Sequence, residues 1–213
     1  MKNVAAVVLA AGEGTRIKAR NRNKVTFLLA GKPMIWYSVQ TIKKAGIEKI
    51  VAVIKFKAES VKRALGSSVV YAIQGDKKGT AAALEDGIKN IKFPVEKVFV
   101  IYGDDSAFYT PELFKFIIAE HDKNAADVSI LSIKLDNPMG LGRIVRRKNG
   151  GIEKIVEEKV ASDEEKKIQE VNTGCYCFNL DFLKKYLPEI KMNPTSGEYY
   201  LTDIVDVALQ NGR

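Results

Sequence analysis

The stretch Val4-Ala5-Ala6-Val7-Val8-Leu9-Ala10, followed by Ala11-Gly12-Glu13-Gly14, decides the fold of this chain. A continuous apolar run of this length predicts a strand that is buried on both faces, as strands of parallel sheets are. The glycines that follow favour a tight turn whose free N–H groups can hold an anion. We therefore expect a phosphate-binding loop at the end of this strand. A plain strand-to-helix turn is the alternative, since Gly-x-Gly alone is a weak signal.

Strand and helix patterns alternate through the first part of the chain. This order is typical of an α/β fold with a doubly wound, mostly parallel, Rossmann-like sheet. Ligands bind such sheets beyond the carboxyl ends of the strands, which directs attention to the residues after Leu9, Ile73 and Tyr102. The expected strands are 4–10, 49–54, 69–73, 98–102 and 128–133, and the expected helices are 34–45, 58–65, 80–91 and 111–120.

The pattern changes after Pro138. Residues 143–147 and 152–156 flank Asn149-Gly150 and predict a hairpin. A strand over 171–178 and helices over 180–186 and 202–209 follow. We expect a single domain over residues 1–213, in which residues 136–213 form a lid over the cleft of residues 1–135.

The composition fits a globular domain. The chain has 213 residues, of which 46% are hydrophobic and 28% charged, so it can bury a core. No apolar run approaches the roughly 18 residues of a membrane span, and the start lacks a signal-peptide pattern. We therefore expect a cytoplasmic protein without a membrane partner.

The net charge of +8 could suit nucleic acid or small polyanionic substrates. Most lysines are dispersed beside glutamates, which favours an ordinary solvated surface, and no nucleic-acid partner is expected. Cys175 and Cys177 share one face of a strand and are expected in the core. The single histidine, His121, is expected on the surface.

Charged and polar side chains follow the expected strand ends. Arg16 and Lys24 come soon after the glycine turn, and two cations held by one loop suit a triphosphate. Asp104 comes just past the strand 98–102, where a carboxylate can hold Mg²⁺ on phosphate oxygens; a helix-capping or turn role is the alternative. The amide of Gln74, also at a strand end, can read the edge of a base unless it is a surface side chain.

These segments together resemble the sugar-phosphate nucleotidyltransferases. The resemblance covers essentially the whole chain and is greatest to the uridylyltransferase domain of the bifunctional UDP-N-acetylglucosamine pyrophosphorylase/glucosamine-1-phosphate acetyltransferase. It is carried by Leu9-Ala10-Ala11-Gly12-x-Gly14-Thr15-Arg16, Gln74 with Gly79-Thr80-Ala81, Tyr102-Gly103-Asp104, Gly140-Leu141-Gly142-Arg143-Ile144, Ile155-Val156-Glu157-Glu158-Lys159, Asn172-Thr173-Gly174 and Gly197-Glu198-Tyr199-Tyr200-Leu201-Thr202-Asp203.

The resemblance implies transfer of a uridylyl group from UTP to N-acetylglucosamine 1-phosphate. The products would be UDP-N-acetylglucosamine, a cell-wall precursor, and pyrophosphate. The implied cofactor is Mg²⁺ on Asp104, with Arg16 at the leaving pyrophosphate and Lys24 at the α-phosphate and sugar phosphate. Residues 1–135 would bind the nucleotide through Leu9, Ala10, Ala11, Gly12, Gly14, Thr15, Gln74, Gly79 and Thr80, and residues 136–213, with Tyr102, would bind the sugar through Gly142, Glu157, Asn172, Tyr200 and Thr202.

Other readings of the site remain open. Taken alone, Glu157 would be a surface charge, and Tyr200 and Thr202 would have core or capping roles. A different sugar phosphate or base, such as glucose 1-phosphate with dTTP or UTP, would use the same first motif. A catalytically weak nucleotide-binding protein is the alternative from another functional class.

The chain departs from the family's pattern at two places. The family places proline directly before the catalytic lysine, whereas Asn23 precedes Lys24 here in a loop one residue longer. Arg20 or Arg22 could then share the role of Lys24. In the family a later stretch supplies an asparagine as a second metal ligand, and this sequence ends at Arg213. We expect a raised Mg²⁺ requirement and low turnover. If the chain instead saturates at submillimolar Mg²⁺, a residue within it completes the site, and Asp203 or Asp105 would be the first candidates.

Overall fold

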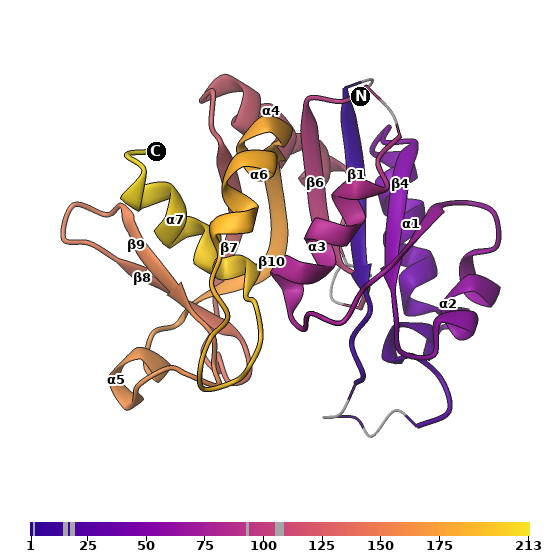
Figure 1. The fold of residues 1–213 in the computed structure, drawn as a ribbon, viewed down its shortest axis with the longest axis horizontal. Coiled ribbons are helices and arrows are strands. Elements are labelled where there is room, and N and C mark those ends of the chain that lie inside the picture. The colour runs from indigo at the N-terminus through magenta and orange to yellow at the C-terminus, as the bar shows by residue number, and fades with distance from the viewer. Residues whose placement is uncertain (2, 15–16, 18–19, 93, 105–108) are drawn as a thin grey trace.

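The computed structural model describes residues 1, 3–14, 17, 20–92, 94–104 and 109–213. These residues form one eight-stranded sheet in the order β5-β4-β1-β6-β10-β8-β9 (Figure 1). The eighth strand, β7, also pairs with β10, along the edge that does not face β6. The strands are β1 (Val4–Ala10), β4 (Lys49–Ile54), β5 (Val70–Ile73), β6 (Lys97–Tyr102), β7 (Val128–Lys134), β8 (Gly142–Arg146), β9 (Ile152–Val156) and β10 (Glu170–Asn179), with a separate hairpin of β2 (Leu28–Leu29) and β3 (Lys32–Pro33).

The parallel part of the sheet confirms the expected α/β class. Strands β5, β4, β1 and β6 are all parallel, with Val7 of β1 between Val51 of β4 and Val100 of β6. Every residue of β1 is buried, as the continuous apolar run predicts. The strand β7 does not continue the parallel sheet beside β6. Instead, β10 lies between β6 and β7 and is antiparallel to both. Local sequence patterns do not specify such a pairing between distant segments.

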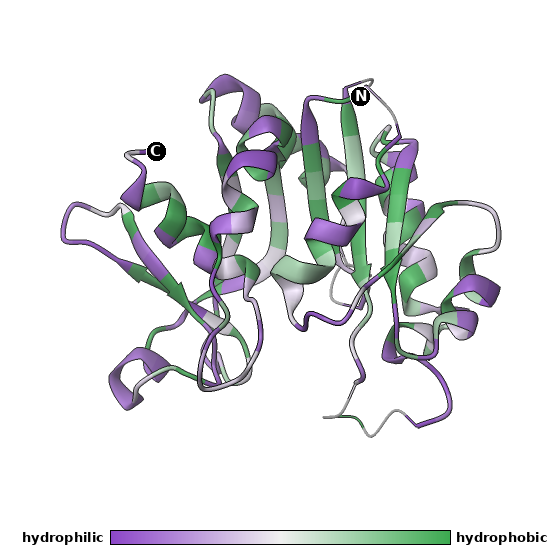
Figure 2. Ribbon diagram, in the orientation of Figure 1, coloured by the Kyte–Doolittle hydropathy of each residue, from purple (hydrophilic) through white to green (hydrophobic). Residues whose placement is uncertain are grey.

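Helices cover both faces of the sheet, so the doubly wound arrangement is also confirmed. Val7 and Leu9 of β1 face one apolar cluster, and Ala6 and Val8 face the other. Figure 2 shows the apolar strands β1, β4 and β6 between helices with polar outer surfaces. The first cluster includes α3 (Thr80–Lys89), α6 (Leu180–Tyr186) and α7 (Ile204–Gln210), and the second includes α1 (Met34–Lys44), α2 (Ala58–Leu65) and α4 (Pro111–Lys123).

The second half of the chain extends the sheet away from its parallel part. The β8–β9 hairpin and the short helix α5 (Asp163–Lys166) lie on the opposite side of the molecule from α1 and α2 (Figure 1). The helix expected over 202–209 is divided into a 3-10 turn, Leu201–Asp203, and α7.

The predicted positions of the two cysteines and of the histidine have different outcomes. Cys175 and Cys177 are free and fully buried, which confirms their place in the core. His121 is only 3% exposed, so the expected surface position is wrong. Helix α4 continues past it to Lys123, and His121 follows Phe114 and Ile118 on the inner face, with its Nδ1 2.9 Å from the Ser129 hydroxyl.

Among the described residues, none of the helices has both the length and the apolar character that crossing a bilayer would require.

Candidate functional site

An ion pair lies at the carboxyl ends of the central strands. Lys24 Nζ is 2.5 Å from Asp104 Oδ2, and the two side chains are 35% and 18% exposed. Asp104 follows β6, whose neighbour β1 ends at the glycine loop; the N–H of Gly103 donates to the carbonyl of Leu9 at 3.0 Å. The structure therefore brings together two of the three residues expected to be catalytic. The third, Arg16, lies outside the described residues.

The glycine loop continues β1 into the same edge of the sheet. Leu9, Ala10 and Ala11 are buried, and their carbonyls accept hydrogen bonds from the N–H of Gly103, from Asn23 Nδ2 and from the N–H of Phe56 respectively; their expected contact with the nucleotide stays a prediction. Gly14 has a φ of 64°, a left-handed conformation that glycine adopts without steric cost. Nothing lies within 4 Å of a Cβ built at Gly12, so the backbone there is open to a close approach. Thr15 lies outside the described residues.

Asn23 fixes the turn that carries Lys24. It caps the 3-10 turn Lys24–Thr26 and its side chain is fully buried. Its Oδ1 accepts from the N–H of Val25 at 3.1 Å. Its Nδ2 donates to the carbonyl of Ala10 at 2.9 Å and lies 3.3 Å from that of Gly12, so the turn is bonded to the end of β1 and to the glycine loop.

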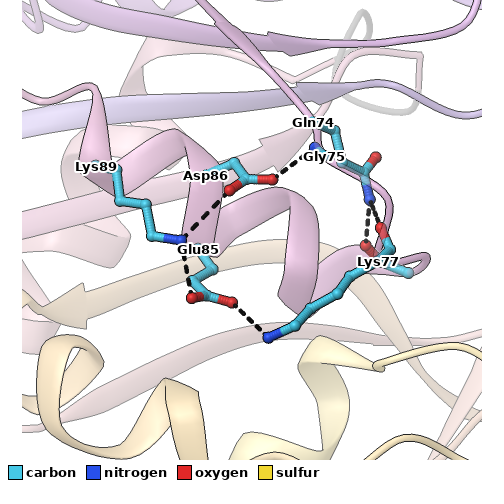
Figure 3. Close-up of polar contacts among 7 residues, drawn as sticks. Gln74, Gly75, Lys77, Glu85, Asp86 and Lys89 are labelled. Carbon is cyan, nitrogen blue, oxygen red and sulfur yellow. Dashed lines mark hydrogen bonds and ion pairs between the residues drawn. The ribbon is translucent and has the colours of Figure 1, made fainter.

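Gln74 lies in a loop that is tied back to α3. It is 8% exposed, and its Nε2 donates to the carbonyls of Lys77 and Gly79 at 2.9 and 3.3 Å. The surface alternative for this side chain is therefore wrong. Figure 3 shows the side-chain oxygen of Gln74 pointing away from these two carbonyls. Asp86 accepts from the N–H of Gly75 at 2.9 Å and Glu85 pairs with Lys77 at 3.5 Å.

The start of α3 joins the two halves of the chain. Gly79 has a φ of 106°, and a Cβ there would meet the carbonyl oxygen of Tyr199 at 2.3 Å. The same carbonyl accepts from the N–H of Ala81 at 3.0 Å. The hydroxyl of Thr80 accepts from the N–H of Leu201 at 2.8 Å. The expected nucleotide segment at Gly79 and Thr80 is thus in direct contact with the expected sugar segment.

Glu157 follows β9 and faces inward. Its Oε1 accepts from the hydroxyl of Thr202 at 3.1 Å, and Thr202 is 1% exposed. A Cβ on Gly142 would lie 3.6 Å from Glu157 Oε2, so Gly142 belongs to the same group. Glu157 is therefore half-buried and hydrogen-bonded, rather than an ordinary solvated surface charge. The half-buried carboxyl of Asp203 lies near the charge of Glu157: partial burial, then the charges of Asp206 and Glu157, raise the pKa of Asp203 to about 6.

A buried network connects the sugar residues to α3. Asn172 Nδ2 donates to the Tyr176 hydroxyl at 2.5 Å, and the side chains of Tyr176 and Thr80 both hydrogen-bond Tyr102. Burial raises the pKa of both Tyr102 and Tyr176 well above the usual tyrosine value, so both hydroxyls stay protonated at neutral pH. Gly174 leaves room for the Tyr102 ring, because a Cβ there would meet it at 2.4 Å.

The Tyr200 hydroxyl is not part of this hydrogen-bond network. Tyr200 is 6% exposed, and its hydroxyl has no hydrogen-bond partner within the described part of the chain. Its expected contact with the sugar stays a prediction.

The roles of two residues of the site, Tyr176 and Arg143, were not predicted from the sequence. Tyr176 lies in an apolar strand pattern that indicates only core, and its hydroxyl role depends on Asn172 and Tyr102. Arg143 is fully buried and pairs with Glu158 at 2.7 Å; it also donates to the carbonyls of Leu141 and Lys166, which fixes the turn before β8. A charged residue in a motif rich in glycine carries no local signal of burial.

The residues at the Lys24–Asp104 pair fit a magnesium ion in one respect. Asp104 offers a hard carboxylate oxygen at the phosphate loop, and Mg²⁺ commonly binds one or two carboxylates together with substrate phosphates and water. No cluster of three or more His, Cys, Asp or Glu side chains that could hold a metal occurs in the described ranges. Asp203, one of the two candidates to complete the site, lies near the charges of Glu157 and Asp206, and Asp105 lies outside the described residues.

Comparison with known proteins agrees with this arrangement. The family model described as nucleotidyl transferase matches residues 5–213. The chain belongs to the nucleotidyl transferase family. It is 40% identical over 213 residues to the bifunctional protein GlmU of Acetivibrio thermocellus, covering 100% of this chain and 46% of that protein. It is 39% identical over 207 residues to the bifunctional protein GlmU of Geobacillus thermodenitrificans, covering 97% of this chain and 45% of that protein.

This nucleotidyl transferase chain therefore spans about half the length of the curated relatives that it matches. Its fold is similar to that of a UDP-glucose pyrophosphorylase solved with UDP-glucose, with a TM-score of 0.79, 21% identity and coverage of 97% of this chain and 87% of that one. It is also similar to a glucose-1-phosphate thymidylyltransferase, named as putative, from Bacillus anthracis, with a TM-score of 0.76, 25% identity and coverage of 98% and 84%. The expected family, enzyme class and fold are confirmed.

Proposed function

We propose that this nucleotidyl transferase joins UTP to N-acetylglucosamine 1-phosphate and releases pyrophosphate. The observation that supports it most is the pairing of Lys24 with Asp104 at 2.5 Å beside the glycine loop. A cation, a carboxylate and the exposed backbone of Gly12 lie there at the carboxyl ends of parallel strands. Phosphoryl-group transfer depends mainly on such positioning and charge neutralisation.

The reaction is an in-line displacement at the α-phosphorus of UTP. An oxygen of the sugar phosphate forms the new P–O bond, and the bond to the pyrophosphate group breaks with its electron pair leaving on pyrophosphate. The attacking oxygen is already anionic, so the reaction needs no general base. Lys24 neutralises charge at the α-phosphate and the sugar phosphate, and Arg16 does so at the pyrophosphate.

Asp104 would hold the metal in this proposal. Mg²⁺ would supply neutralisation of phosphate charge when bound. Lys24 pairs directly with the Asp104 carboxylate in the structure, and the same carboxylate would hold the ion. With one carboxylate ligand, the affinity for Mg²⁺ depends on bound nucleotide. A Mg²⁺ titration of activity tests this: half-saturation above the submillimolar range is expected, and full activity at submillimolar Mg²⁺ would remove the single-ligand proposal.

Residues 1–135 bind the nucleotide in this proposal, and residues 136–213, together with Tyr102, bind the sugar. The base is read by Gln74 and by backbone groups near Ala11, Gly12 and Gly79. The sugar hydroxyls and acetamido group are contacted by polar side chains of the buried network. These are Tyr102, Glu157, Asn172 and Thr202, with the backbone of Gly142 and the ring of Tyr200.

The choice of substrate is supported by the sequence resemblance. Relatives at 39–40% identity carry the name bifunctional protein GlmU, and the motifs of this chain resemble the uridylyltransferase domain of the bifunctional UDP-N-acetylglucosamine enzyme. The second candidate is glucose 1-phosphate with dTTP or UTP. It is favoured by the structural similarity, at 25% identity, to a protein titled a glucose-1-phosphate thymidylyltransferase.

Pyrophosphate release tests the proposal directly. The chain is assayed with each of UTP, dTTP and CTP against N-acetylglucosamine 1-phosphate and glucose 1-phosphate. UTP with the acetamido sugar is expected to give the highest kcat/KM, since a site that leaves polar groups unpaired with the wrong ligand loses several kcal/mol. Equal efficiency with CTP would refute the uridylyl assignment, and no release with any pair would refute the enzyme itself.

A further inference from the structure

Asn23 makes more connections than its place in a polar loop suggests. Its side chain is 0% exposed. Besides its bonds to Val25, Ala10 and Gly12, Nδ2 donates to the carbonyl of Phe56 at 2.9 Å. Its backbone N–H donates to the Ser60 hydroxyl at 2.9 Å, and its carbonyl accepts from the Thr26 hydroxyl at 2.7 Å. One residue thereby joins the end of β1, the glycine loop, the β4–α2 connection and the turn of Lys24.

These bonds use both ends of the amide. Oδ1 can only accept and Nδ2 can only donate, so their partners fix the orientation of the side chain. A buried amide that loses such partners costs about 1–3 kcal/mol. The φ of Asn23 is −67°, the value that a proline ring imposes. Asparagine here holds by hydrogen bonds a backbone angle that proline would hold covalently.

The consequence falls on the next residue. Lys24 begins the turn that Asn23 caps, and it reaches Asp104 across the end of the sheet. A lysine side chain is long and flexible, and ordering it costs conformational entropy. When the backbone of Lys24 is held in place, its ammonium group samples fewer positions.

We propose that Asn23 is a positioning residue that holds Lys24 against Asp104 and fixes the position of this pair relative to the glycine loop. The proposal rests on the proposed function, because this position is taken to increase the rate of transfer at the α-phosphorus. Asn23 touches no substrate; it acts through Lys24.

Kinetics of Asn23→Ala, Lys24→Ala and the double variant test the proposal. Asn23→Ala is expected to lower kcat about 100-fold, the size of effect that a misplacement of about 1 Å produces, with a smaller change in the KM for UTP. Because Asn23 acts through Lys24, the double variant is expected to be within about 3-fold of Lys24→Ala. Wild-type kcat in Asn23→Ala, or losses that multiply in the double variant, would overturn the proposal.

Stability is separated from positioning by a matched control. Ser129→Ala removes another hydrogen bond, partly buried, to His121 Nδ1 at 2.9 Å, away from the candidate site. It is expected to lower Tm and leave kcat within about 2-fold. If Asn23→Ala does not fold, Ser60→Ala takes its place, since it removes only the acceptor of the Asn23 N–H and the donor of a local bond to the Lys57 carbonyl. A reduction of kcat of about 5-fold that disappears in the Lys24→Ala background supports positioning; no reduction, or one that persists there, overturns it.

A labelling measurement keeps this inference distinct from the proposed function. The reaction of Lys24 with an amine-specific reagent is followed by peptide mass spectrometry in the absence of substrate. Lys24 is expected to react several-fold faster in Asn23→Ala than in Ser129→Ala, because its ammonium group leaves Asp104. An unchanged labelling rate would overturn the positioning role whatever the activity. Absence of pyrophosphate release in the wild type, with faster labelling in Asn23→Ala, would refute the function and leave the positioning intact.

Discussion

In residues 1–135 the candidate site groups stand at the ends of strands, whereas in residues 136–213 they are enclosed. Lys24 and Asp104 are 35% and 18% exposed and pair with one another at the open edge of the sheet. Asn172 and Thr202 are 5% and 1% exposed and bond to Tyr176 and Glu157. The first arrangement leaves charge accessible to a phosphate, and the second builds the polar groups into the core. Substitutions of Lys24 or Asp104 should therefore reduce the rate with little change in stability, and those of Asn172 or Thr202 should reduce stability and binding together.

The largest effect is expected for Asp104→Asn. It removes a charge from the open edge of the sheet but preserves shape, so kcat is expected to fall about 10²–10³-fold, as when one electrostatic group of an active site is lost, with Tm nearly unchanged. Steady-state pyrophosphate release at saturating Mg²⁺ and a thermal melt measure both. Asp181→Asn is the control, since its carboxylate is 95% exposed. A near-normal rate in Asp104→Asn would remove Asp104 from the mechanism. Arg16→Ala carries the same expectation.

Gly79→Ala tests the junction between the halves. Its methyl group would meet the Tyr199 backbone at 2.3 Å in a left-handed conformation, so we expect a loss of about 2–4 kcal/mol of stability and higher KM values for both substrates. Gly150→Ala is a matched control, because Gly150 has a φ of 85° and nothing within 4 Å of its Cβ position. Denaturant unfolding of both variants isolates the clash from the strain. Equal losses in the two would show that the junction is not tightly packed.

Tyr176→Phe tests the buried network and is expected to reduce stability less than Gly79→Ala does. It removes the hydroxyl that Asn172 and Tyr102 contact, which loses about 1 kcal/mol and is expected to raise the KM for the sugar phosphate about 5-fold with kcat maintained. Tyr71→Phe is the control, since its hydroxyl bonds only the carbonyls at Gly66 and Lys62 within the described residues. A change in the KM for UTP but not in that for the sugar phosphate would contradict the placement of this network in the sugar half.

The smallest effect concerns Asp203. Its folded-state pKa is raised to about 6 from 3.8, first by burial and then by the charges of Asp206 and Glu157. The folded state thus binds a proton more tightly than the unfolded chain does, so its contribution to stability is complete below about pH 4 and is lost as the pH rises through about 6. Allowing for solvent screening, the loss is on the order of 1 kcal/mol. Urea unfolding of the wild type and Asp203→Asn between pH 4 and 7 measures it; parallel curves would contradict the raised pKa.

The two halves also differ in how far the sequence predicts them. The bounds of β1 and β4 follow from continuous apolar runs. The candidate site residues after β1, β5 and β6 follow from the rule that ligands bind at the carboxyl ends of parallel strands. The position of β10 between β6 and β7 does not, because pairing across the sheet has no local pattern. Asn23 lies in a polar stretch that gives no sign of burial, and Tyr176 lies in an apolar stretch that gives no sign of its hydroxyl bonds.

Strand β10 has a consequence for any attempt to divide the chain. Its final residues pair with β6 and its first residues pair with β8, while β7 runs along its other edge. Tyr176 shares one apolar cluster with Val7 and Leu201. Fragments 1–135 and 136–213 would each expose an unpaired strand edge and half of that cluster. We expect neither fragment to fold alone, so complementation by mixing them would restore the domain only through bimolecular assembly, with a concentration dependence that the intact chain does not have.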